Sequence, residues 1–167
     1  PRSLVVANQW ALGGLFTLLY FQVEKSPYWV HMLRAIFRDT DAAFAPYYSA
    51  GFAALLLMIG LPIILSGAVL PLLFHLMRRE ADHLGDLAGN LYSWNTVGSL
   101  IGALFGGYVL YFWFDLHQIY RLAIAALALS AVLLTTRVYG WRPFSGALAL
   151  AGVLIGLLAM PAWDHRI

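Results

Sequence analysis

Five long apolar stretches dominate this chain and limit what it can fold into. They cover residues 4–22, 47–74, 91–114, 118–136 and 144–162 of a 167-residue sequence. A helix needs about 20 apolar residues to cross the hydrocarbon core of a bilayer, and these runs lack the period-two alternation of barrel strands. The sequence therefore predicts an all-α, polytopic membrane protein with about five transmembrane helices, in one membrane domain over residues 1–163.

The scarcity of charge agrees with this prediction. Hydrophobic residues make up 62% of the chain and charged residues 11%, whereas soluble domains carry about 25% charged residues. So few charges cannot cover a water-facing surface, which excludes an ordinary soluble enzyme and a nucleic-acid-binding module. The expected partner is the lipid bilayer, and the expected location is a membrane, specifically the bacterial inner membrane.

The segment 24–46 differs from the five apolar stretches because charged and apolar residues alternate along it. Leu33, Ile36 and Phe37 fall on one helical face, Trp29 extends that face, and Arg34 falls on another. This pattern predicts a short amphipathic helix lying at the membrane interface. A helix that covers the ends of its neighbours is an alternative with equal support.

Proline and tryptophan mark details of the spans. Pro62 and Pro71 interrupt the second stretch, where each removes a backbone donor, so we expect kinks there. Tryptophans flank the third and fifth stretches and are predicted to anchor them at the lipid headgroups. These residues are Trp94, Trp113, Trp141 and Trp163.

The third stretch carries the sharpest local pattern. At 100° per residue, a wedge about 100° wide holds Asn95, Gly98, Ser99, Gly102 and Gly106. Small residues let a second helix approach closely, and an asparagine can hydrogen-bond across the contact. The pattern predicts a helix-packing face toward other membrane helices or subunits.

A ligand groove is the alternative interpretation of the same stretch. Asn95, Thr96 and Ser99 would line it, because polar groups at membrane depth are often functional. Elsewhere the sequence offers no catalytic arrangement, no metal site and no cofactor motif, and the chain has no cysteine. Asp115 and Arg121 flank a short turn and are predicted to form an interfacial ion pair.

Several short motifs occur together from Leu61 onward. They are Leu61-Pro62, the run 66–73 (SGAVLPLL), and GxLYxxNTxGxxxGxxxxG over residues 89–107. Together they resemble the membrane region of spermidine-synthase-like proteins. In this chain Asn90 stands where that family's motif has a basic residue. Pro161-Ala162-Trp163-Asp164 resembles the linker that leads to that family's soluble domain. Residues 164–167 would be the start of this linker.

The resemblance implies a multi-helix membrane domain that precedes an aminopropyltransferase-like domain. The catalytic positions of that family lie outside these residues, so no catalytic residue is expected here. The chain begins at Pro1 and is expected to be an internal piece of a longer protein. Because five spans would place five Lys and Arg residues on each side, the charge distribution does not predict which side is cytoplasmic.

Three functions remain open from the sequence. The first is a membrane anchor or partner-binding domain of a spermidine-synthase-like protein, inactive by itself. The second is an accessory structural subunit of a larger membrane complex. The third is a transporter-like domain for a polyamine or another small molecule, which the absence of Asp and Glu from the five stretches disfavours.

Overall fold

The described residues of the computed structural model, 2–37, 41–79, 83–140 and 143–163, are mostly helical and contain no strand. The helices in chain order are α1 (Arg2–Val23), α2 (Ser26–Ile36), α3 (Asp41–Met77), α4 (Leu84–Gly107), the 3-10 turn η1 (Val109–Phe112), α5 (Leu116–Tyr139) and α6 (Pro143–Ala159). The predicted all-α class is confirmed.

Four helices are long and apolar enough to cross a membrane. They are α1, α3, α4 with its continuation into η1, and α5. The last helix, α6, has 17 residues, which rise about 25 Å and fall short of a hydrocarbon core of about 30 Å. The predicted count of five is therefore not reached by helix length, because the fifth stretch leaves the helix after Ala159.

Two helices begin earlier than predicted. Helix α3 starts at Asp41, so residues 41–46 belong to it and not to an interfacial segment. Helix α4 starts at Leu84, seven residues before the predicted stretch 91–114. Asp86 lies in its first turn, where a carboxylate interacts favourably with the positive end of the helix dipole.

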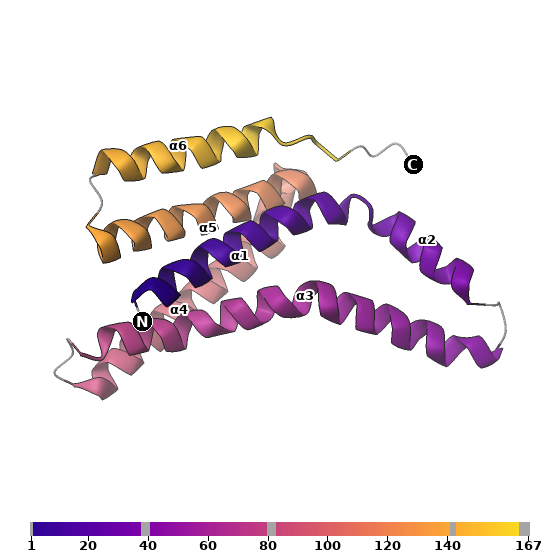
Figure 1. Cartoon of the computed structure of the whole chain (residues 1–167), viewed down its shortest axis with the longest axis horizontal. Coiled ribbons are helices and arrows are strands. Elements are labelled where there is room, and N and C mark those ends of the chain that lie inside the picture. Colours follow the sequence, from indigo (N-terminus) through magenta and orange to yellow (C-terminus); the bar gives the residue numbers. More distant parts are fainter. Residues whose placement is uncertain (1, 38–40, 80–82, 141–142, 164–167) are drawn as a thin grey trace.

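Four helices form a single row. In Figure 1, α1 lies between α3 and α5, and α6 lies on the far side of α5. Contacts between α1 and α3, α1 and α5, and α5 and α6 join the row. Helix α3 bends in its middle part (Figure 1), and Pro62 lies near the middle of its sequence. A proline inside a helix is the commonest cause of such a bend.

The amphipathic helix α2 packs beside the first half of α3. Its Leu33 side chain comes within 3.6 Å of where a Cβ of Gly51 would lie, and the rings of Phe37 and Tyr47 are 5.9 Å apart. Ile36 remains 72% exposed. The predicted apolar face is thus divided, since part of it packs on α3 and part stays free for lipid.

Candidate functional site

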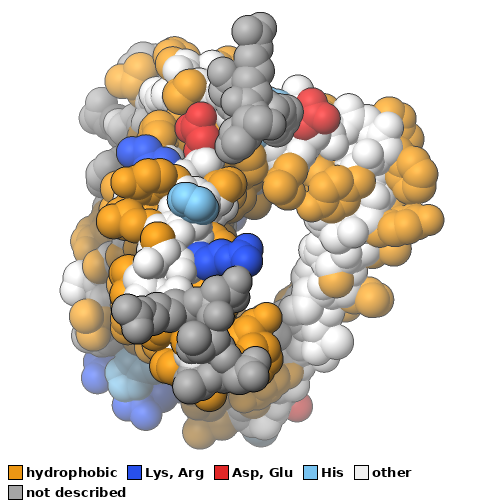
Figure 2. All heavy atoms as spheres, turned by 90° about the vertical axis from the view of Figure 1, so that its right-hand side faces the viewer, with side chains coloured by type: hydrophobic (Ala, Val, Ile, Leu, Met, Phe, Trp, Pro, Cys, Tyr) orange, Lys and Arg blue, Asp and Glu red, His pale blue; other side chains and the backbone are white. Residues whose placement is uncertain are grey.

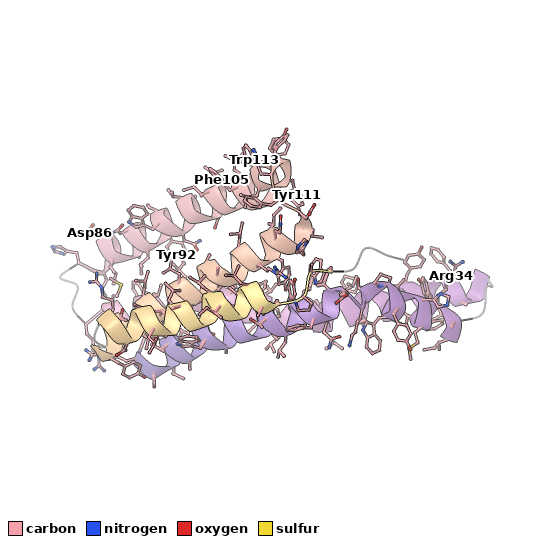
Figure 3. The ribbon with its side chains drawn as sticks, turned by 90° about the horizontal axis from the view of Figure 1, so that it is seen from above. Arg34, Asp86, Tyr92, Phe105, Tyr111 and Trp113 are labelled. Atoms are coloured by element: carbon pink, nitrogen blue, oxygen red, sulfur yellow. The ribbon has the colours of Figure 1, made fainter. Side chains whose placement is uncertain are left out.

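Helix α4 stands apart from the row. None of its residues is buried, and its main contacts with the described elements are with α3 and with η1, which directly follows it. Figure 3 shows α4 separated from α5 along most of its length, with the two converging at η1, where Tyr111 and Trp113 lie. A helix without a buried face inside its own chain has both faces free for lipid or for other helices.

The predicted packing face has no partner within the described residues. A Cβ added at Gly98, Gly102 or Gly106 would meet nothing within 4 Å. Tyr92 points from α4 into the space beside α5 (Figure 3), and helical spacing puts its side chain about 60° from the centre of the small-residue face. The face therefore lies on the side of α4 that looks toward the row.

An open hollow separates α4 from the row. Figure 2 views the molecule along its long axis, with α4 as the right-hand column and the hollow in the middle. Much of the surface that this column turns to the hollow is white, the colour of backbone and of glycine, serine and asparagine, whereas its outer side is largely hydrophobic. The small-residue side of α4 thus borders a space that no described residue fills.

The residues predicted to line a groove do not enclose one. Asn95, Thr96 and Ser99 are all exposed. The Thr96 hydroxyl donates to the carbonyl of Tyr92 over 2.9 Å, within its own helix. A depression does occur at the elbow between α4 and η1, but it is lined by Gly107, Tyr108, Tyr111 and Phe112.

The four predicted anchors differ in their environments. Trp94 is 71% exposed and Trp113 is 72% exposed, as an anchor in the headgroup region requires. Trp163, by contrast, is only 8% exposed and has little surface left for lipid headgroups. Its indole packs on Tyr20 instead, with ring centroids 5.0 Å apart. Trp141 lies outside the described residues.

Polar side chains connect α1 to its neighbours, and the sequence interpretation did not assign them this role. The Asn8 amide donates to the Leu65 carbonyl of α3 over 2.9 Å. On the other side, Gln9 donates to the Ser130 hydroxyl, and the Trp10 indole donates to the Thr135 hydroxyl over 3.0 Å. The signal was the presence of Asn8 and Gln9 inside an apolar stretch, because polar groups in a span bond between helices.

A second polar cluster lies where α1, α5 and the end of α6 meet. The Arg121 guanidinium donates to the Tyr20 hydroxyl over 3.1 Å and also to the carbonyl of Met160. The Tyr20 hydroxyl donates to the carbonyl of Pro161 over 2.7 Å. The Trp163 indole donates to the backbone carbonyl of Tyr20 over 3.2 Å. We call these residues, with Met160 and Pro161, the Tyr20 cluster.

This cluster corrects the predicted ion pair of Asp115 and Arg121. Asp115 is the N-cap of α5 and forms a capping box with Gln118, each side chain bonding the other residue's backbone. Arg121 turns away to the carbonyl end of α6. Asp115 thus bonds to local backbone, whereas Arg121 bonds to distant groups, the Tyr20 hydroxyl and the Met160 carbonyl.

Apolar packing surrounds the cluster. Tyr20, Ile124, Leu157 and Trp163 form its buried centre. The ring of Tyr120 lies 5.7 Å from that of Tyr20. This buried group joins residues from the beginning, the second half and the end of the sequence.

The described residues contain no group of three or more His, Cys, Asp or Glu side chains that could hold a metal ion. No protein-family model, curated protein or solved structure matches the chain.

Proposed function

We propose that the chain is a membrane-embedded helical domain that binds a transmembrane helix of a partner chain, with α4 as its binding element. The single observation that carries the proposal is α4 itself, an apolar helix of 24 residues without a buried residue. Helices in lipid associate through close backbone contact at small residues. The open positions at Gly98, Gly102 and Gly106 offer such a contact.

The arrangement of the hollow supports a helix as the occupant. The small-residue side of α4 faces the row across an open space (Figure 2), so a partner helix placed there would touch α4 on one side and the row on the other. Asn95 is exposed on this side and has an amide that can bond across the contact. Lipid chains would gain little from a face that lacks side chains.

The proposal includes five membrane crossings. In Figure 1 successive helices of the row run in opposite directions, so α6 runs in the same direction as α1. Four helices have the length to cross, and α6 returns along α5. With five crossings, the segment after α6 would leave the membrane on the side opposite to the start of α1.

The resemblance to spermidine-synthase-like proteins suggests which kind of soluble domain this membrane domain would anchor. It rests on the motif at residues 89–107, which forms most of α4. On this proposal, the domain holds an aminopropyltransferase-like part at the membrane and has no transferase activity alone. Turnover of decarboxylated S-adenosylmethionine and putrescine by the 167-residue chain would contradict it. The accessory-subunit alternative shares the same binding element.

Site-specific photocrosslinking in membranes tests the binding element. A benzophenone amino acid at Ser99 lies on the small-residue face, and one at Leu104 lies on the opposite side of α4. We expect protein adducts from Ser99 and mainly lipid adducts from Leu104. Lipid adducts alone from both positions would overturn the proposal, whereas an adduct of twice the chain mass would identify a second copy as the occupant.

A further inference from the structure

Helix α6 is shorter than the thickness of the hydrocarbon core of a bilayer. Its 17 residues rise about 25 Å, whereas the hydrocarbon core is about 30 Å thick. Two more residues in extended conformation add about 7 Å. Met160 and Pro161, which follow α6 without helical structure, would therefore be enough to complete a crossing.

Backbone that is not helical can lie at membrane depth only when its polar groups have partners within the protein. The N–H of Met160 donates to the Leu157 carbonyl over 3.4 Å, and its carbonyl accepts from Arg121. Pro161 has no N–H, and its carbonyl accepts from the Tyr20 hydroxyl. Both residues that would have to lie in the core thus meet the requirement.

The charge of Arg121 is matched in the same place. Its guanidinium is half-buried and bonds to the carbonyl end of α6, where the helix dipole places about half a negative charge. The ring of Tyr20 lies 5.8 Å from the guanidinium carbon. An arginine inside a membrane-length helix is costly without such partners, so these contacts account for its position.

Trp163 secures the far end of the same segment. Its indole is buried against Tyr20, which is fully buried, and it donates to the Tyr20 carbonyl. The segment is therefore fastened at Met160, Pro161 and Trp163 by side chains or backbone of α1 and α5.

We infer that Met160–Trp163 is a non-helical strap that completes the fifth membrane crossing, and that Arg121 and Tyr20 are the positioning residues that hold it. The inference rests on the five crossings of the proposed function and adds how the short last helix achieves its crossing. It also assigns Arg121 a role inside the protein instead of at the lipid headgroups.

Cysteine labelling can test the crossing, because the chain has no cysteine of its own. Single substitutions Tyr139→Cys, Ala159→Cys and Ala162→Cys place a thiol before α6, at its end and in the strap, at positions that are exposed in the chain. In sealed vesicles, we expect a membrane-impermeant maleimide to label residues 139 and 162 from opposite sides. Residue 159 should not react, because lipid shields it from the reagent although no protein group covers it.

Second substitutions in the Ala159→Cys chain test the strap. Arg121→Gln and Tyr20→Phe remove donors to the strap carbonyls, so the end of α6 should move toward water and residue 159 should react about tenfold faster. Arg121→Lys keeps a charged donor and should retain protection. Arg137→Gln, at the other end of α5, is the matched control and should change nothing.

The outcomes separate the two proposals. Labelling of residues 139 and 162 from the same side would overturn both the fifth crossing and the strap. Labelling from opposite sides, with residue 159 unaffected by Arg121→Gln and by Tyr20→Phe, would leave the five crossings standing and overturn the role of the strap. Tyr20→Phe removes a single oxygen, so it serves as the test if Arg121→Gln does not fold.

Discussion

The Nε atom of Arg121 donates a hydrogen bond of 3.1 Å to the hydroxyl of Tyr20, and the two residues are 101 positions apart in sequence. The same hydroxyl donates onward to the Pro161 carbonyl. One oxygen atom therefore links α1, α5 and the segment after α6. Because the two residues in each of these bonds are more than 100 positions apart in sequence, the cluster forms only when the row of helices has assembled.

Removal of the Tyr20 hydroxyl should destabilise the fold. Tyr20→Phe keeps the buried ring but leaves the Pro161 carbonyl without its donor and Arg121 with one acceptor fewer. We expect a loss of about 1–3 kcal/mol in the free energy of unfolding, measured by denaturation in detergent micelles. Tyr28→Phe is the control, because Tyr28 is 63% exposed. Equal stability of the two variants would contradict the structural role of the hydroxyl.

The glycine face of α4 should matter for association and not for folding. Gly102→Leu introduces a large side chain into open space, so the free energy of unfolding of the isolated chain should stay nearly constant. Partner retention on purification should fall, since the side chain separates the two helices. Leu104→Ala, on the opposite side, should retain the partner. Loss of the partner in Leu104→Ala alone would place the contact on the other side of α4.

Gly146 should be sensitive to substitution because α5 and α6 approach closely there. A Cβ on this buried glycine would lie 2.8 Å from the Cγ2 atom of Thr136. Gly146→Leu should therefore push α6 away from α5 and lower the unfolding free energy by about 1–3 kcal/mol. Thermal unfolding can compare it with Gly156→Leu, where a Cβ meets nothing within 4 Å. Similar melting temperatures for both variants would refute the close approach.

Gln9 and Ser130 should respond asymmetrically to substitution. Gln9 is 8% exposed and donates to Ser130, whose hydroxyl has a second partner in the Leu127 carbonyl. Ser130→Ala leaves a buried amide unpaired, so we expect it to cost about 1–3 kcal/mol, more than Gln9→Leu. The double variant should regain most of the loss. A double-mutant cycle on unfolding free energies checks this, and simple additivity of the two losses would count against the bond.

Helix content and the apolar character of the long helices could be predicted from the sequence because they depend on local composition. The stretches around α1, α5 and α6 were located to within a few residues, since a run of apolar side chains is helical in lipid wherever it lies. The prediction failed at residues 41–46 and 84–90, where α3 and α4 begin before the predicted apolar stretches. Hydropathy reports the boundary of an apolar run, whereas a helix continues as long as its backbone bonds are made.

The chemistry of individual side chains was predictable only where it is local. The sequence alone predicts that Gly98, Gly102 and Gly106 share a face, because helical spacing fixes their relative directions. It also determined that Asn8 and Gln9 are unusual in an apolar stretch. The packing of the helices leaves the glycine face without a contact among the described residues, buries Trp163 and brings Arg121 to the end of α6. These outcomes depend on which helices become neighbours, and that is set by the summed packing of residues far apart in the sequence.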